Sequence, residues 1–118
     1  MTSAARVHVE SRGDLVVAAI HGEIDLTNSP RIGSQLFAAI PNTARGVILN
    51  LSQTTYIDSR GVQLILDAIE RLHTRKQAMH LVVPAASPLW RLFGILSIAQ
   101  VAVIFQTVDA AVDAFGER

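Results

Sequence analysis

The feature that most constrains the fold is a regular alternation between short apolar runs and longer segments in which apolar residues recur every three or four positions. The apolar runs are typical of strands covered on both faces, and they occupy residues 15–20, 47–51, 80–83 and 101–105. Helical periodicity predicts helices over residues 29–40, 59–72, 87–96 and 107–115. When helices follow strands in this order, the strands are expected to be parallel and joined by right-handed crossovers.

The N-terminal part departs from that order. Residues 6–10 alternate polar and apolar side chains, and residues 11–14 include Gly13 and Asp14, which favour a turn. This pattern predicts an antiparallel hairpin with the strand at 15–20. We therefore expect one α/β domain over residues 1–118 with a core over about 6–116. It should have about five strands, mostly parallel with an antiparallel N-terminal strand, and about four helices.

The helix starts carry recognisable signals. Ser29 is expected to cap a helix with Pro30 at its first position, and Ser87 with Pro88 repeats the pattern. Thr107 is expected to open the last helix. The expected buried stripes include Ile32, Leu36 and Ile40 in the first helix, Ile65 and Leu72 in the second, and Leu89, Leu92, Phe93 and Leu96 in the third.

Composition excludes several classes of function. The formal net charge is zero, so the basic surface that binds nucleic acid is not expected. The chain has no cysteine, hence no disulfide and no thiolate metal site, which is compatible with the reducing cytoplasm. No apolar run approaches the roughly 20 residues of a membrane span, and the first ten residues lack the apolar region of a signal peptide.

No catalytic or cofactor motif is evident. Glycine-rich nucleotide loops and Gly-x-Ser-x-Gly are absent, and the four histidines lack metal-ligand spacing. Glu23 and Asp25 could form a carboxylate pair, but a domain of this size has little room for an enclosing cleft, and loop residues are the simpler interpretation. We expect no enzyme activity, no cofactor and no metal.

One segment is unusual, residues 54–66, "TTYIDSRGVQLIL". Ser59 lies where a helix should begin. Its hydroxyl is most simply an N-cap, which is worth about 1 kcal/mol. A phosphate on the same hydroxyl would also be stabilised by free N–H groups and the helix dipole, and Gly61 would leave the backbone open to a partner. The two interpretations are compatible.

The segment "VILNLSQTTYIDSRGVQLIL", with "HGEIDLTNSP" before it and "SPLWRLFGIL" after it, resembles the STAS domain of bacterial anti-sigma factor antagonists. The resemblance extends over about residues 7–115. Its specific parts are Asp-Ser-x-Gly at 58–61 and Gly-Glu-Ile-Asp at 22–25. It implies a STAS-like sandwich with the element order predicted above.

The resemblance also implies a function. In the family, an anti-sigma factor that is also a serine kinase phosphorylates the serine after the Asp, which is Ser59 here. The unphosphorylated protein binds the anti-sigma factor and releases a sigma factor, and a metal-dependent serine phosphatase reverses the modification. By the same resemblance the partner-binding residues are Asp25, Asp58, Ser59, Arg60 and Gly61. A homodimer is also compatible with the sequence.

Two positions depart from the family pattern in ways that affect the prediction. Arg60 stands where Ser or Thr is usual, and we expect it to narrow the choice of kinase or to weaken the repulsive effect of a phosphate. Ser97 stands where many members have a Gly that ends the third helix, so we expect strain or a different helix end there. Gln63 stands where family members often have a second glycine or another small residue.

Other functions of the same fold remain open. Related STAS domains serve as soluble subunits of transport complexes and as signalling scaffolds without a phosphoswitch. A small-ligand or nucleotide binder is a further alternative, although no phosphate loop is visible.

Overall fold

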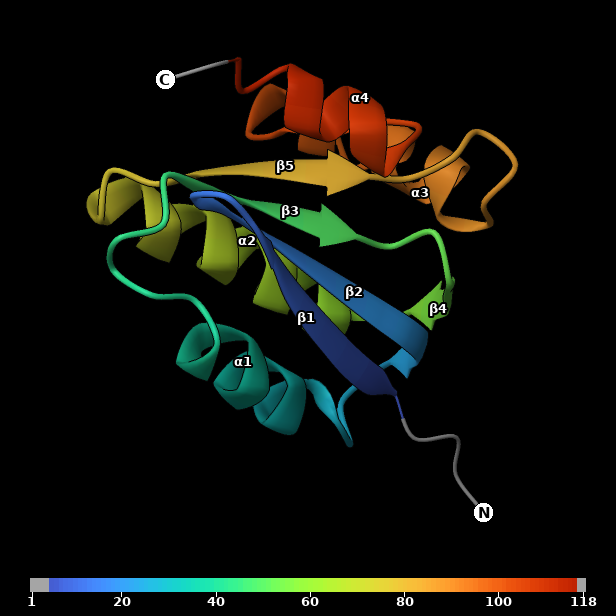
Figure 1. Cartoon of the computed structure of the whole chain (residues 1–118). Helices are drawn as coiled ribbons and strands as arrows, with labels where there is room; N and C mark the ends of the chain where they lie inside the picture. Colours follow the sequence, from blue (N-terminus) through green and yellow to red (C-terminus); the bar gives the residue numbers. More distant parts are fainter. Residues whose placement is uncertain (1–4, 117–118) are drawn as a thin grey trace.

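A computed structural model of the chain describes residues 5–116, which form a twisted sheet with helices on both faces (Figure 1). The elements follow one another as β1 (Arg6–Arg12), β2 (Leu15–Ile24), α1 (Ser29–Ala38), β3 (Gly46–Asn50), β4 (Thr54–Ile57), α2 (Ser59–Thr74), β5 (Ala78–Val82), α3 (Leu89–Ile95), the 3-10 helix η1 (Ile98–Gln100), β6 (Val103–Phe105) and α4 (Val108–Asp113).

The strands of the sheet have the predicted directions. Its strand order is β1-β2-β3-β5-β6, with β1 antiparallel to β2 and the other neighbours parallel. A short sixth strand, β4, was not expected; it pairs in parallel with the carboxyl end of β2, from Gly22 to Ile24, after a shift of register. The predicted α/β fold class is confirmed, and β4 is what brings the chain before Ser59 alongside the end of β2.

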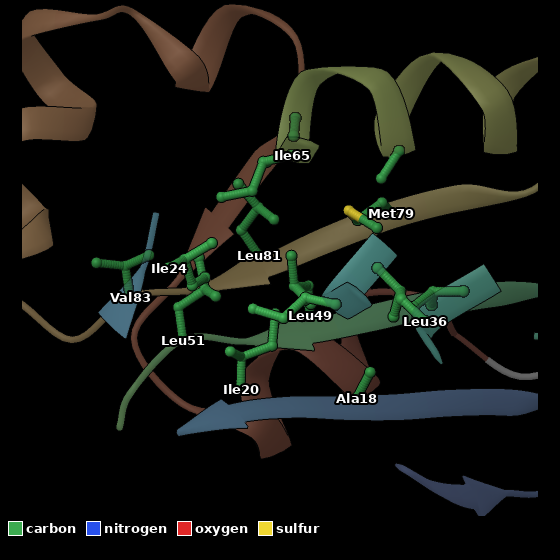
Figure 2. Close-up of a cluster of buried hydrophobic side chains, with 14 of the residues drawn as sticks. Ala18, Ile20, Ile24, Leu36, Leu49, Leu51, Ile65, Met79, Leu81 and Val83 are labelled. Atoms are coloured by element: carbon green, nitrogen blue, oxygen red, sulfur yellow. The ribbon is translucent and has the colours of Figure 1, made fainter. Parts of the chain in front are cut away.

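Side chains alternate between the two faces of the sheet. In β2, Val16, Ala18 and Ile20 face the main core, while Leu15 and Val17 face a smaller cluster. Helices α1, α2 and α3 cover the first face, and α4 covers the second through Ala111. Figure 2 shows the main core, where Leu36 and Ile65 meet side chains of the strands. This two-layer burial explains why the central strands are apolar without interruption.

The helix stripes agree with most of the predictions. Ile32, Leu36 and Ile40 are buried, as are Leu89 and Phe93, but Leu96 is exposed because α3 ends at Ile95. Thr107 caps α4, with its hydroxyl accepting from the N–H of Ala110 at 3.1 Å. Ser97 has φ 56°, so the strain expected at the end of the third helix is present.

Most element boundaries differ from the prediction by a few residues, and three of the starts have an identifiable cause. Helix α1 begins at Ser29 itself, after Asn28, and α3 begins after Pro88, where the Ser87 hydroxyl accepts from the N–H of Leu89. The last strand begins at Val103 rather than at residue 101, because η1 turns the chain before it. Apolar content alone did not distinguish that turn from a strand.

Helix α4 is fastened at the amino ends of the strands. The guanidinium of Arg45, which precedes β3, donates to the carbonyls of Phe115 and Gly116 at 2.8 Å each and forms an ion pair with Asp14 at 3.1 Å. The His80 ring stacks on Phe115 at 3.9 Å between centroids. The end of the described chain is therefore held where the strands begin, at the opposite end of the sheet from the carboxyl ends of the strands.

Candidate functional site

The candidate site lies at the carboxyl edge of the sheet, where β2 and β4 end side by side. Residues 25–28 follow β2 and lead into α1, and Asp58 follows β4 and leads into α2. The backbone N–H of Asp58 donates to the carbonyl of Ile24 at 3.1 Å, which holds the two segments together. Loops at this edge of a parallel sheet are the usual place for binding sites in α/β folds.

Asp58 organises both segments with one carboxylate. Its Oδ1 accepts from the N–H groups of Arg60 at 2.9 Å and Gly61 at 3.0 Å, and its Oδ2 accepts from the N–H of Leu26 at 3.0 Å. Asp58 is thus the N-cap of α2. The expectation that Ser59 caps this helix was wrong: Ser59 is its first residue, one position later in the chain.

The loop after β2 is closed by its own side chains. Asp25 Oδ1 accepts from the N–H of Thr27 at 2.9 Å and from its hydroxyl at 2.6 Å. Buried Asn28 accepts from the N–H of Asp25 at 3.0 Å and donates to the carbonyl of Glu23 at 2.8 Å. Sequence reasoning missed Asn28, although an Asn directly before a Ser-Pro helix start is a recognisable turn signal.

The closed loop presents Leu26 to solvent. This leucine is 60% exposed, although its backbone is fixed by Asp58. An exposed leucine on a fixed backbone loses little entropy when a partner covers it, so it suits a contact with another protein. Leu26 was not singled out from the sequence, because nothing in the local pattern shows that it points outward.

Ser59 is exposed at the start of α2. The free N–H groups expected to stabilise a phosphate there are largely occupied, since Arg60 and Gly61 already donate to Asp58. A phosphate on Ser59 would therefore lie at a helix end where the Arg60 and Gly61 N–H groups already donate to the Asp58 carboxylate. The expectation of vacant N–H donors at this helix end is therefore wrong, and an added negative charge would lie near the Asp58 carboxylate.

Gly61 is buried, contrary to the expectation that it opens the backbone to a partner. A Cβ at this position would lie 3.0 Å from the carbonyl oxygen of Ile24 and in collision with the Ile57 side chain. Glycine is required there because α2 passes directly against β2 and β4. Its N–H contributes to the site only through Asp58.

The ionised form of Asp58 is favoured. The hydrogen bond from the Gly61 N–H holds the pKa of this carboxyl below its ordinary value, and the Leu26 and Arg60 N–H groups and the Arg60 charge act in the same direction against partial desolvation. The exposed Arg60 side chain stands beside Ser59 at the head of α2. The carboxylate that links the two loops is therefore charged at neutral pH.

A groove of about 700 Å³ is lined by residues of α1 and α2, including Arg60, which follows Ser59. It is open to solvent, and its walls include Ser34, Phe37, Arg60, Gln63, Asp67 and Arg71. The Arg71 guanidinium lies 3.9 Å from the centre of the Phe37 ring. Charges of both signs line this groove, so it has no clear preference for an anion or a cation.

Within residues 5–116 no group of three or more His, Asp or Glu side chains is arranged to hold a metal ion. The Asp25 carboxylate is used inside its own loop, while Glu23 is exposed on β2. Of the helices that the structure describes, none has the length and apolar character needed to cross a bilayer.

The chain belongs to the STAS domain family, whose model matches residues 6–111. The matched range includes residues 58–61, which contain Asp58 and Ser59.

Solved structures with the same fold include an anti-sigma factor antagonist from Mycobacterium paratuberculosis, with a TM-score of 0.85 and 18% identity over 97% of this chain and 96% of that one. The unphosphorylated anti-sigma factor antagonist SpoIIAA has a TM-score of 0.69 and 23% identity over 95% and 97%. A sulfate transporter family protein from Wolinella succinogenes has a TM-score of 0.67 and 17% identity over 81% and 80%.

Proposed function

We propose that this chain is an anti-sigma factor antagonist that is switched by phosphorylation and is itself not a catalyst. In the unphosphorylated form it binds an anti-sigma factor with serine kinase activity and so releases a sigma factor to join RNA polymerase in the cytoplasm. Phosphorylation of Ser59 ends the contact, and a metal-dependent serine phosphatase restores it. No nucleic acid takes part in the binding.

The observation that carries the proposal is the position of Ser59. Its hydroxyl is exposed at the first residue of α2, directly after the carboxylate that fixes the exposed Leu26. A kinase can reach this hydroxyl, and a partner that covers Leu26 would lie against it. The proposed contact surface comprises Asp25, Leu26, Asp58, Ser59 and Arg60, whereas Gly61 acts from inside by allowing the close packing of α2.

The energetics are sufficient for a switch. A phosphoserine carries about −1.5 to −2 charges at neutral pH. At about 5 Å from a carboxylate of the partner and an effective dielectric near 20, one unit of charge raises the free energy of the complex by about 3 kcal/mol. A hundredfold loss of affinity requires only about 2.7 kcal/mol. Simple repulsion can therefore separate the complex without refolding either protein.

The similarity to solved antagonists supports this function. SpoIIAA has been solved in both an unphosphorylated and a phosphorylated form, and this chain matches the phosphorylated form with a TM-score of 0.64 over 95% of its length. That protein therefore shares this fold in both states of its own modification.

The test is to incubate the protein with ATP and each anti-sigma factor kinase of the same organism, and to map the phosphate by mass spectrometry. We expect one phosphate on Ser59, absent from Ser59→Ala and retained in Ser34→Ala, which removes another exposed serine on α1. Binding of the kinase should fall about a hundredfold on phosphorylation. If no such kinase binds or modifies the protein, the proposal is wrong.

A second candidate is a soluble STAS subunit of a transport complex, or a signalling scaffold without a phosphoswitch. The similarity to the Wolinella succinogenes protein favours it. In that case Ser59→Ala and Ser59→Asp should bind the transport partner with equal affinity, and the kinases should leave the protein unmodified.

A further inference from the structure

The two edges of the sheet differ in how they are protected. Among the described residues, β1 forms one edge and β6 the other. The exposed side chains of β1 include Arg6, His8, Glu10 and Arg12, whose polar and charged groups keep another strand from pairing there. The β6 edge has neither a charged residue nor a proline, and it is the less guarded of the two.

The lack of charge extends well beyond β6. Residues 92–108, between Arg91 and Asp109, contain no charged side chain, although charged residues make up 17% of the protein. This stretch includes the end of α3, η1 and the whole of β6. Surface segments of soluble proteins normally carry charges, which discourage association.

The same stretch exposes large apolar side chains. Ile95 is 72% exposed, Leu96 44%, Val101 54% and Val103 53%. We call these four residues the edge patch. They account for more than half of the large exposed apolar side chains among the described residues, the others being Leu26, Tyr56 and Trp90. Val103 lies on β6 and Val101 just before it, while Ile95 and Leu96 lie at the end of α3, which contacts η1, and η1 in turn contacts β6. Exposed apolar groups on and near an uncharged strand edge mark an interaction surface.

We propose that the edge patch is the surface on which a second copy of this chain docks, with the two β6 strands antiparallel across a two-fold axis. In such a contact each residue near the axis meets its own equivalent, so a charged residue would face the same charge. A neutral segment avoids this repulsion. An acidic or basic partner, in contrast, would find no opposite charge on residues 92–108.

Hydrogen bonds between the two paired strands would fix how the two copies are oriented. An edge strand has N–H and C=O groups that bond only to water in the monomer, and antiparallel pairing joins them between copies while the edge patch is covered. Strands β3 and β5 lie between β2 and β6 in the sheet. The loops around Ser59 follow β2 and β4, neither of which pairs with β6, and the dimer and the switch are tested by separate measurements.

Sedimentation equilibrium of the purified chain alone, from about 1 µM to about 1 mM, tests the proposal over the range where weak dimers form. We expect the average mass to rise from that of one chain toward that of two. Val103→Lys should weaken association at least about tenfold, because two ammonium groups would meet near the axis. His8→Lys, on the opposite edge, is the matched control and should associate like the parent.

The absence of cysteine allows a second test that does not depend on a disruptive variant. Val103→Cys should form disulfide-linked dimers under mild oxidation much faster than His8→Cys, although both positions are exposed. Equal rates, or a parent protein that stays monomeric at the highest concentration, would overturn the proposal. Because neither measurement involves a kinase, failure here leaves the proposed phosphoswitch untouched.

Discussion

The carboxylate of Asp58 accepts the backbone N–H of Leu26 at 3.0 Å, and so joins two loops whose residues are 32 positions apart in the chain. The same carboxylate begins α2 by accepting from Arg60 and Gly61. The exposed position of Leu26 and the start of α2 at Ser59 therefore depend on one side chain. A change of charge at Ser59 acts directly beside the group that fixes both loops.

Asp58→Ala should destabilise the protein, and Asp58→Asn should do so less. Alanine leaves three backbone N–H groups without an acceptor, whereas asparagine keeps one side-chain oxygen but loses the charge. Urea unfolding at pH 7 measures both effects. Asp113→Asn, at an exposed position on α4, is the control and should change stability less than either.

The effect of Asp58 should depend on pH in a defined direction. Its pKa is lowered in the folded protein, so its contribution to stability is complete above the ordinary aspartate pKa of about 3.9 and is lost as the pH falls through the folded value. The difference in unfolding free energy between the parent and Asp58→Asn should be constant from pH 7 to about pH 5 and shrink below about pH 4. A difference that grows toward acid pH would contradict this assignment.

Gly61→Ala should lower the free energy of unfolding by about 1 to 2 kcal/mol, although alanine is the better helix former. The added methyl group would meet the Ile24 carbonyl and the Ile57 side chain, and neither can move without shifting a strand. The matched control is Gly94→Ala in α3, where a Cβ meets nothing within 4 Å. That variant should be more stable than the parent by up to about 1 kcal/mol.

Arg60→Ser should strengthen the effect of phosphorylation on partner binding. The Arg60 cation lies next to Ser59 and offsets part of a phosphate's charge, so its removal should increase the loss of affinity by roughly two- to fivefold. Titration calorimetry with the kinase partner gives, for the parent and for Arg60→Ser, the ratio of the Kd after phosphorylation to the Kd before it. Equal ratios would show that Arg60 takes no part in the switch.

Ser97→Gly should stabilise the protein by about 0.5 to 1 kcal/mol, because Ser97 has a positive φ that glycine adopts without a steric penalty. Ser97→Ala keeps the penalty and should bring no gain. Thermal unfolding distinguishes the two, and a stabilising alanine variant would mean that the backbone at this position is not strained.

Most of the fold could be predicted from the sequence because the positions of apolar residues show which faces of the strands and helices are buried. Residues 15–20 are apolar on both faces, and Ile32, Leu36 and Ile40 repeat at helical spacing. Strand β4 was missed because it has only four residues and its ends, not alternate positions, are buried. No periodicity can be recognised over so short a segment.

The site was predicted less completely for three physical reasons. Asp and Ser are almost equally good N-caps, so their adjacent positions at 58 and 59 did not show which of them caps α2. The reason for Gly61 lies in Ile24, on a different strand. The position of Leu26 depends on one hydrogen bond to Asp58, which can form only when β4 has paired with β2.

The fastening of Phe115 and Gly116 by Arg45 has a practical consequence for measurements on this protein. A linker joined after Gly116 would leave from the amino ends of the strands, which are the end of the sheet opposite to Leu26 and Ser59. Immobilisation through that linker on a biosensor chip would leave Leu26 and Ser59 turned toward the injected partner.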